Sequence, residues 1–423
     1  MLERVTAPAG PVRNPAARGR LATMQGEHQS RGGDQLGLRA YNKRMILNLI
    51  RQNGALPKAE IARLTGLSAQ AVSVIVNALL KEKLVRKEKK VRGKVGQPHT
   101  PIALNASGVL SLGVKIGRRS LELMLVNFHG EAVDYQRIAY AAPRQQEVFA
   151  LLRRELARML NGVEDSLRSR IVGIGVAMPG HISAWADVMG LDPNDLADWN
   201  EVDVAALLAD ITGLPVEVYN DATAACAAEM VLGSTLTASS ALYIYVGTFI
   251  GGGIVINGQL FEGAQRNAGA IGSMPVNDGK GGQEQLIRQG SLLPLENALR
   301  AAGLGTPGTI ADAVRDPRAA CAFDTWCRRA APPVAEAVAA ALSVVDFEVV
   351  VIDAMLHRPE VEVFVAAVRA ALKRLDLTGT STAPLLTGSI GPKARVCGAA
   401  ILPLIRQFSP DQQLLVKKVA SAA

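Results

Sequence analysis

The chain has 423 residues, a net charge of +8, 49% hydrophobic residues, 40 glycines and 21 prolines, which is typical of a soluble α/β protein of two or three domains. No apolar run approaches the roughly 20 residues of a membrane span, and the mixture of Arg, Pro and Ala in the first residues argues against a secretory signal. The four cysteines form no C-x-x-C pair, which argues against a disulfide framework and a thiolate zinc site, so we expect a cytoplasmic protein.

Positive charge is concentrated at one end of the chain. Residues 1–105 hold 19 Lys and Arg against 6 Asp and Glu, whereas the remainder holds 27 against 32. A solvated basic face is the simplest explanation of such an excess. Because the excess lies in one segment that also carries a folded motif, nucleic acid is the favoured partner.

Residues 1–36 show neither helical nor strand periodicity and are rich in Arg, Ala, Gly and Pro. We expect a disordered tail here. Met24 is an alternative start of the protein, and the sequence leaves that choice open.

Residues 37–104 have the pattern of a winged helix-turn-helix domain. A helix from Tyr41 ends near Asn53-Gly54, a short helix from Pro57 ends at Gly66, and a third follows Ser68, a suitable N-terminal cap. The segment VRKEKKVRGKVGQPHTPIAL then reads as two strands joined by a basic turn. Two short helices with a tight turn, followed by a wing, are typical of DNA-binding proteins.

The third predicted helix would present small polar residues on the face opposite its apolar stripe. Such a helix fits the major groove, where amide and hydroxyl side chains reach base edges, while basic residues of the wing contact phosphates. The alternative is a three-helix bundle used for protein contacts. The predicted DNA-binding residues are Ser68, Gln70, Ser73, Asn77, Arg92 and Lys94.

Residues 110–423 alternate strands and helices, after a junction at NASGV, residues 105–109. Apolar runs predict strands at 112–116, 121–127, 171–177, 216–219, 241–246 and 349–352, with helices between and after them. This alternation predicts an α/β body whose sheets are covered by helices. The strand-hairpin-helix order could start twice, near residues 112 and 241.

Four segments of this body resemble the ROK family of repressors, open reading frames and sugar kinases. They are LGVKIGRRS at the first hairpin, GIGVAMPG ending at Gly180, YNDATAACAAE from Tyr219, and VGTFIGGGIVINGQLFEGAQRNAGAIGSMPV from Val246. The resemblance implies a two-lobed, actin-like, ribonuclease H-like ATPase fold with a sugar cleft between the lobes. A winged helix-turn-helix before such a body is the arrangement of the family's transcriptional repressors.

The first hairpin departs from the family's kinases, which carry D-x-G-G-T there to position magnesium and admit ATP phosphates. In this chain Lys115 stands at the place of the Asp, and Arg118 and Arg119 replace the Gly-Thr. A cation instead of a carboxylate, with two large side chains beside it, predicts that Mg-ATP is not bound. An anion attracted by the basic turn is the alternative.

Asn220 and Asp221 match the kinase residues that bind sugar hydroxyls, the Asp also being the general base there. Without ATP opposite it, Asp221 would act only as a hydrogen-bond acceptor for a polyol, so no catalytic residue is predicted. An alternative role for Asp221 is the N-terminal cap of the helix that follows.

Other nucleotide contacts are also altered. In GTFIGGG, Thr248 and the glycines could hold phosphate, although glycines that simply permit a tight turn between buried strands are the favoured interpretation. Asp353-Ala354 stands where the kinases tend to show Gly-Gly beside the adenosine.

The implied sugar site is partly kept. Where relatives show A-G-E-x-G-H, residues 268–273 read AGAIGS, and VNDGKGGQEQL follows in place of a cysteine-rich zinc segment. Zinc is therefore not expected. Glu284 is a candidate for the position of the family's last sugar-binding Glu. The predicted ligand-binding residues are Gly180, Asn194, Asn220, Asp221, Thr248 and Asn267.

The sequence thus predicts a DNA-binding regulator, a repressor of carbohydrate genes, whose degenerate kinase body senses a sugar or sugar derivative. The expected partners are operator DNA, the sugar, and one or three further copies of the chain, without a membrane. Two alternatives stay open: an active ATP-dependent sugar kinase joined to a DNA-binding domain, and a body that serves only as a dimerisation scaffold.

Overall fold

A computed structural model describes residues 35–90, 99–180, 182–183, 186, 190–233, 238–305 and 310–410. Contacts divide the chain into one unit, Asn42–Pro410, and a second formed by Met1–Tyr41 and Asp411–Ala423. Of the second unit, only residues 35–41, the first turns of α1, are described. The predicted tail therefore lies outside the described residues except at its last two positions, which are helical.

The predicted helix-turn-helix is present. It consists of α1 (Gln35–Asn53), α2 (Lys58–Thr65) and α3 (Ala69–Lys81), with α2 and α3 inclined by 117°. Gly66 ends α2 in the left-handed conformation that its missing Cβ permits, and the Ser68 hydroxyl accepts a hydrogen bond from the Ala71 N–H at 3.1 Å. The inward faces of the helices form one apolar cluster that includes Ile46, Ile61, Val72, Val76 and Leu79.

The wing strands are shorter than the sequence pattern indicates. β1 (Val85–Lys87) pairs antiparallel with β2 (Ile102–Leu104), each strand contributing three residues. The predicted basic turn between them, residues 91–98, lies outside the described residues and takes Arg92 and Lys94 with it.

The body contains two five-stranded sheets of the same topology. The first has the order β5-β4-β3-β6-β7 and the second β10-β9-β8-β13-β14. Each is an antiparallel three-stranded meander followed by two parallel strands, which confirms that the predicted pattern occurs twice. The first-sheet strands are β3 (Leu110–Ile116), β4 (Ser120–Asn127), β5 (Ala132–Ala139), β6 (Ile171–Met178) and β7 (Val216–Asn220). The second-sheet strands are β8 (Ala241–Val246), β9 (Ile250–Ile256), β10 (Gln259–Phe261), β13 (Val349–Ala354) and β14 (Leu385–Thr387).

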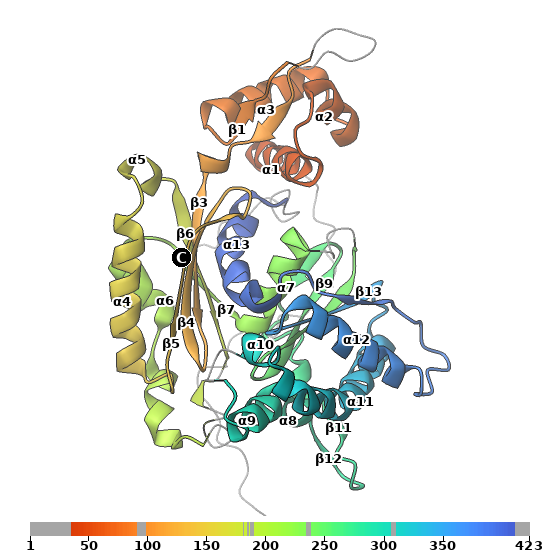
Figure 1. Ribbon diagram of the computed structural model, residues 1–423. Coiled ribbons are helices and arrows are strands. Elements are labelled where there is room, and N and C mark those ends of the chain that lie inside the picture. Colours follow the sequence, from red (N-terminus) through yellow and green to blue (C-terminus); the bar gives the residue numbers. More distant parts are fainter. Residues whose placement is uncertain are drawn as a thin grey trace, which may run out of the picture. The chain divides into compact units, whose positions relative to one another are not determined.

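Central strands are buried on both faces because helices cover both sides of each sheet, which explains their nearly continuous apolar runs. In the first sheet, α4 (Gln145–Asn161) and α6 (Val204–Thr212) cover one face and α13 (Ala394–Phe408) the other. In the second, α7 (Asp221–Leu232) covers one face, and α11 (Ala320–Val344) with α12 (Arg358–Leu372) the other. Figure 1 shows α7 and α13 lying between the two sheets.

The remaining elements connect these layers. The short helices are α5 (Asp165–Arg168), α8 (Leu286–Gln289), α9 (Leu293–Ala301) and α10 (Ile310–Ala313), and a small hairpin joins β11 (Pro275–Asn277) to β12 (Gln283–Gln285). The 3-10 turns are η2 (Ala106–Gly108), η5 (Pro193–Glu201), η6 (Ile271–Ser273), η7 (Pro317–Ala319) and η8 (Gly391–Lys393). No single helix in the described ranges is long and apolar enough to cross a membrane. Together, α2 and α3 have the length and apolar composition of a span, but they are bent by 117° and pack into the apolar cluster of the helix-turn-helix.

The two helices between the sheets touch backbone to backbone. A Cβ on Gly398 in α13 would lie 1.6 Å from the carbonyl oxygen of Ala224 in α7. On its other side α13 meets glycines of the first sheet, because a Cβ on Gly175 would lie 2.0 Å from the Ala399 carbonyl oxygen. These glycines set the spacing of the central layers.

We expect Gly398→Ala to destabilise the protein by about 2 kcal/mol or more, because the added methyl group forces α7 and α13 apart. Urea unfolding of the full chain measures this. Gly162→Ala is the control, since the C-cap Gly162 has an ordinary φ of −76° and its Cβ would meet nothing closer than 3.5 Å. Equal stabilities of the two variants would contradict the close contact.

Candidate functional site

The outward face of α3 carries the side chains predicted to read DNA bases. Gln70 and Asn77 are exposed and Ser73 is partly exposed, while Val74 between them is 65% exposed. Lys58, at the start of α2, donates a hydrogen bond to the Asn77 Oδ1 at 3.1 Å. The arrangement leaves amide and hydroxyl groups on one accessible helical face, as base contacts require.

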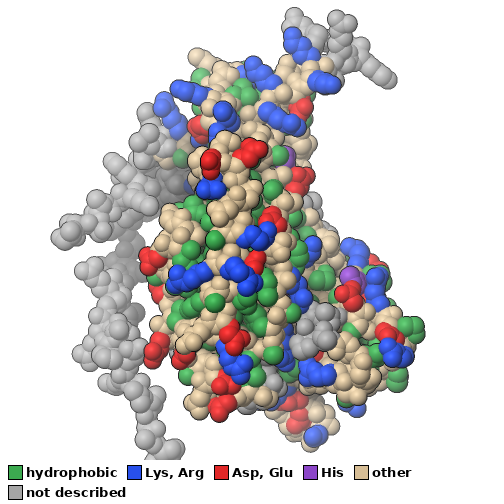
Figure 2. Space-filling model, turned by 60° about the vertical axis from the view of Figure 1, so that its left-hand side comes forward, with side chains coloured by type: hydrophobic (Ala, Val, Ile, Leu, Met, Phe, Trp, Pro, Cys, Tyr) green, Lys and Arg blue, Asp and Glu red, His purple; other side chains and the backbone are tan. Residues whose placement is uncertain are grey.

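Basic side chains adjoin this face. Figure 2 shows Lys and Arg gathered at the top of the view, where the helix-turn-helix lies. Lys81, Lys83, Lys87, Lys89 and Lys90 are exposed and follow one another from the end of α3 through β1. Arg86 is exposed too but pairs with Glu88 at 2.9 Å. These lysines are additional candidates for phosphate contacts. They lie in the segment whose excess of positive charge already indicated nucleic acid as the partner.

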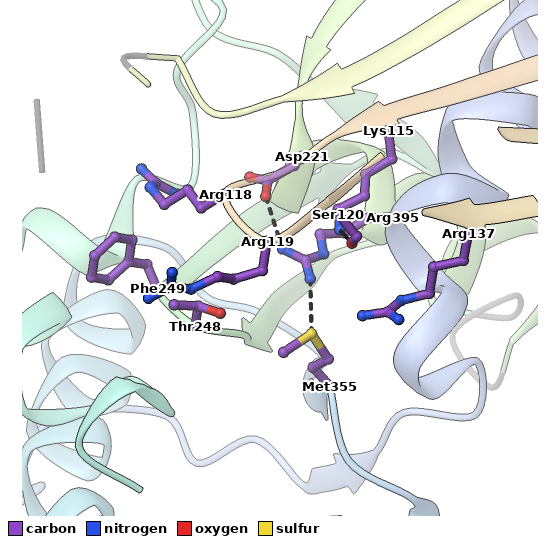
Figure 3. A pocket seen from close by; sticks show the side chains of 10 residues that line it. All are labelled: Lys115, Arg118, Arg119, Ser120, Arg137, Asp221, Thr248, Phe249, Met355 and Arg395. Carbon is purple, nitrogen blue, oxygen red and sulfur yellow. Dashed lines mark hydrogen bonds and ion pairs between the residues drawn. The ribbon is translucent and has the colours of Figure 1, made fainter. Parts of the chain in front are cut away.

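A pocket lies where equivalent turns of the two sheets meet (Figure 3). The turn between β3 and β4 supplies Arg118 and Arg119, and the turn between β8 and β9 supplies Thr248 and Phe249. The empty space is about 340 Å³, including its open mouth. The lining residues are Lys115, Arg118, Arg119, Ser120, Arg137, Asp221, Thr248, Phe249, Met355 and Arg395.

Lys115 forms a buried ion pair inside the first hairpin. Its ammonium group lies 2.8 Å from Glu122 Oε1 and 2.8 Å from the Ser120 hydroxyl. Ser120 and Tyr135 also donate hydrogen bonds to the Glu122 carboxylate, at 2.9 and 3.0 Å. Burial alone would raise the pKa of Glu122, but the charge of Lys115 and these donors outweigh it and lower the pKa to about 2.

The hairpin geometry explains this pairing. Lys115 and Glu122 are direct cross-strand partners of β3 and β4. Gly117 allows the turn to fold over the lysine, since a Cβ there would lie 2.5 Å from Lys115 Cε. The charge of Lys115 is thus compensated by a carboxylate of the same hairpin.

The next two residues of the turn are arginines with different contacts. Arg118 lies over the Phe249 ring at 4.4 Å, so it bridges the two turns by a cation–π contact. Arg119 donates a hydrogen bond to the Ala141 carbonyl oxygen at 2.7 Å. Burial lowers the pKa of Arg118 to about 10, against the opposing effect of Asp221, and the group stays charged at neutral pH.

Asp221, the position of the family's general base, is paired with Arg395 from the first turn of α13. Asp221 Oδ2 lies 3.1 Å from Arg395 NH1, and the two side chains are 16% and 10% exposed. Arg395 also contacts the Met355 sulfur at 3.2 Å and lies 5.0 Å from the centre of the Tyr245 ring. This pair removes one acceptor from the group that would accept a proton in a kinase.

Asn220, not Asp221, caps α7. The Asn220 Oδ1 accepts a hydrogen bond from the Ala222 N–H at 3.0 Å, and Asp221 is the first residue of the helix. The alternative reading of Asp221 as the cap is therefore wrong. Capping leaves the Asn220 amide NH₂ and one Asp221 oxygen available to a ligand.

Thr248 and the glycines of the GTFIGGG segment make their contacts within the protein itself. Thr248 is buried and donates to Glu296 Oε1 at 2.8 Å. The glycines that follow lie in β9 itself, where a Cβ on Gly251 or Gly253 would lie 2.8 or 2.5 Å from side chains of α7. The prediction that these glycines permit a tight turn between buried strands is therefore wrong. They lie in β9 and leave room for the neighbouring helix α7.

Asp353 is a fully buried residue at the end of β13. Its carboxylate accepts hydrogen bonds from Tyr243 OH at 3.2 Å and Gly391 N–H at 2.9 Å. Burial raises its pKa to about 6, despite these hydrogen bonds. The side chain fills space beside Gly388, where a Cβ would meet it at 2.4 Å.

Four predicted ligand-binding residues are not among those that line this pocket. Gly180, Asn194 and Asn267 are exposed, and Asn220 is partly exposed. Asn194 is held by its backbone, whose N–H donates to Asp192 Oδ1 at 2.9 Å. Their role in binding a sugar stays a prediction.

Two segments bear on the expectation that neither magnesium nor zinc is bound. Lys115 at the first hairpin is paired with Glu122, and the hairpin of β11 and β12 has no thiol or imidazole. Asp278 in that hairpin is engaged with the Lys280 and Gly282 N–H groups. Across the described part of the chain, no three His, Cys, Asp or Glu side chains are grouped as a metal would need.

The sequence analysis missed Glu122 and Arg395. Glu122 had a detectable signal, because a turn at Gly117–Arg119 places it opposite Lys115. Arg395 had none, since 174 residues separate it from Asp221 and only the packing of α13 brings them together.

We expect Glu122→Gln to lower the stability at pH 7 by about 3 kcal/mol, because it leaves the buried Lys115 unpaired. The folded pKa of about 2 lies below the ordinary 4.5, so the stabilisation by Glu122 is complete above pH 4.5 and is lost as the pH falls towards 2. Urea unfolding across this range should show the wild type and the variant converging in acid. The exposed Glu201→Gln is the control, and a pH-independent gap would contradict the assignment.

Comparisons with known proteins agree with this architecture. The sequence profile of the ROK family matches residues 111–405, and a profile for winged helix-turn-helix DNA-binding matches residues 39–86. A putative xylose repressor of Caldicellulosiruptor sp. (strain Rt8B.4) is 28% identical over 251 residues, which are 58% of this chain and 61% of that protein. The matched part thus spans less than two thirds of that relative.

Two solved structures share the fold. One is a ROK family transcriptional regulator described as a homologue of the E. coli MLC protein, with a TM-score of 0.63, 19% identity, and coverage of 88% of this chain and 97% of that one. The other is a ROK family glucokinase from Streptomyces griseus in complex with glucose and AMPPNP, with a TM-score of 0.54, 22% identity, and coverage of 69% and 98%. Because the family profile covers more than half of the chain, and the two-sheet body has the family's fold, this protein belongs to the ROK family.

Proposed function

We propose that this chain is a DNA-binding transcriptional repressor of carbohydrate genes, and that its body senses a sugar or sugar derivative without phosphorylating it. The xylose-repressor relative and the matched DNA-binding domain support the regulatory part. The observation that carries the non-catalytic part is the Asp221–Arg395 ion pair beside the basic hairpin turn.

DNA recognition rests on the accessible face of α3. Gln70, Ser73 and Asn77 offer donors and acceptors to base edges, and the exposed lysines after α3 offer charge to phosphates. Arg92 and Lys94 remain proposed phosphate contacts from the sequence alone. A dimer or tetramer would present paired helices to two half-sites.

Sensing requires that a ligand favour one arrangement of the two lobes over another. A sugar would bind Asn220 and Asp221 at the start of α7, and α7 and α13 lie between the sheets. The far end of α13 reaches the DNA-binding part, because Phe408 stacks edge-on with Phe128 at 4.9 Å, and Phe128 accepts a hydrogen bond from Arg51 of α1. A ligand-driven shift of these helices therefore has a route to the DNA-binding domain.

The alternative is an active sugar kinase. Asp221 and the glycines of β9 favour it, but Lys115, Arg118 and Arg119 oppose it, since phosphoryl transfer needs magnesium and room for the whole triphosphate of ATP at this hairpin. Asp353 opposes it too, because it fills the space beside Gly388. We therefore propose that the body needs neither Mg-ATP nor zinc.

Full-length protein should select a preferred duplex from a random-sequence DNA library. Gln70→Ala or Asn77→Ala should then weaken binding to that duplex by about 1–3 kcal/mol and leave binding to random DNA nearly unchanged. Lys87→Ala should weaken binding to all sequences and reduce its salt dependence. Affinities measured at two salt concentrations check both effects.

Arg153→Ala on the exposed face of α4 serves as the control and should change neither quantity. If the selected duplex bound no better than random DNA, or if Gln70→Ala and Asn77→Ala were silent, the base-reading role of α3 would be refuted.

Thermal unfolding with a sugar panel tests the sensor. A sugar bound at about 100 times its dissociation constant should add about 2.7 kcal/mol of stability, and Asp221→Ala should remove that gain. The same sugars with Mg-ATP should give no phosphorylated product. Turnover abolished by Asp221→Asn would establish the kinase instead, and a panel without any stabilising sugar would favour a scaffold.

A further inference from the structure

The pocket between the two hairpin turns has more positive charge than the fold itself compensates. Five cationic side chains line it, namely Lys115, Arg118, Arg119, Arg137 and Arg395. Glu122 pairs with Lys115 and lies 4.0 Å from Arg137, Asp221 pairs with Arg395, and Glu296 acts electrostatically on both Arg119 and Arg300. The lining cations therefore share a smaller number of carboxylates, and positive charge predominates in the pocket wall.

Arg118 is the clearest part of that excess. It lies over the face of the Phe249 ring at 4.4 Å, a contact that orients a guanidinium but does not neutralise it. Its buried Nε has no hydrogen-bond partner among the described residues. A buried donor without an acceptor is costly, so its retention at the pocket wall indicates that a ligand supplies the acceptor.

Two neighbouring arginines show the same incomplete bonding. The buried Nε atoms of Arg119 and Arg395 also have no acceptor in the described part of the chain. One Arg395 terminal nitrogen contacts the Met355 sulfur, a weak acceptor for a charged donor. Figure 3 shows Arg118 and Arg119 extending from the first hairpin turn towards Phe249, while Arg395 of α13 lies against Asp221.

We propose that this pocket binds a phosphoryl group, free or carried by a small molecule, through Arg118, Arg119 and Arg395. A phosphate monoester carries close to two negative charges at neutral pH and three acceptor oxygens, which suits the positive pocket wall and the unpaired donors. A carboxylate supplies only one charge. Guanidinium groups suit such oxyanions because their planar donors bind two oxygens at once.

This inference rests on the proposed sensor and narrows its ligand. Asp221 lies next to the arginines. It could accept a hydrogen bond from a hydroxyl group of the ligand whose phosphoryl group contacts the guanidinium groups. A phosphorylated sugar could therefore contact both the Asp221 carboxylate and the guanidinium groups of the pocket. The bound phosphoryl group would take the place of the ATP phosphates at this turn. It needs no metal ion, because cationic side chains of the protein supply the positive charge.

Calorimetric titration of the full-length chain tests the proposal with four probes: inorganic phosphate, glucose 6-phosphate, glucuronate and glucose. Phosphate and glucose 6-phosphate should bind, and Arg118→Gln or Arg119→Gln should weaken both by about tenfold to a hundredfold. Arg153→Gln, an exposed arginine of α4, should leave both affinities unchanged. Equal affinity for the two probes would identify free phosphate as the ligand, and tighter glucose 6-phosphate would identify a phosphorylated sugar.

The proposal is wrong if phosphate and glucose 6-phosphate bind no better than glucose and glucuronate. It is also wrong if Arg118→Gln and Arg119→Gln leave the affinities for phosphate and glucose 6-phosphate unchanged. Unliganded thermal unfolding of each variant separates lost binding from lost folding. If glucose binds and alters DNA affinity while phosphate does not bind, the anion site is refuted and the sensor is supported. If phosphate binding depends on Arg118 but no probe alters DNA affinity, the anion site is supported and the sensor is refuted.

Discussion

The contact between α7 and α13 fixes the geometry on which the site depends. Gly398 and Ala224 bring the two helix backbones together, and Gly175 brings α13 equally close to the first sheet. Small residues at these crossings leave no room for independent adjustment of the layers. The spacing of the two sheets follows from this contact, and with it the position at which their hairpin turns meet.

Charge at that meeting point is organised by buried pairs. Lys115 pairs with Glu122, and Asp221 pairs with Arg395, so each of these two pocket residues has a partner of opposite charge. Breaking a buried pair is costly, so these contacts hold the turn and the start of α7 in place. The same pairs leave Arg118 without a carboxylate partner among the described residues, which is why we infer an anionic ligand rather than a metal-bound nucleotide.

The position of α13 also suits a regulator. Its first turn holds Arg395 at the pocket, and its last turn holds Phe408 against Phe128, whose carbonyl oxygen binds Arg51 of the helix-turn-helix. One rigid helix therefore touches both the ligand side and the DNA-binding side. Coupling between sites needs a differential effect of ligand on two states, and a helix with contacts at both ends can transmit it.

Local sequence determined much of this protein. The third helix, its Ser68 cap and the Gly66 stop follow from short-range preferences, and the doubled strand pattern follows from continuous apolar runs, so both were predictable. The motif substitutions at Lys115, Arg118 and Arg119 were visible in the same way. Tertiary structure alone decided what those side chains touch. The partner of Asp221 lies 174 residues further along the chain, and the glycines of β9 leave room for side chains of α7. Such contacts depend on how distant elements pack, which no local pattern of residues encodes.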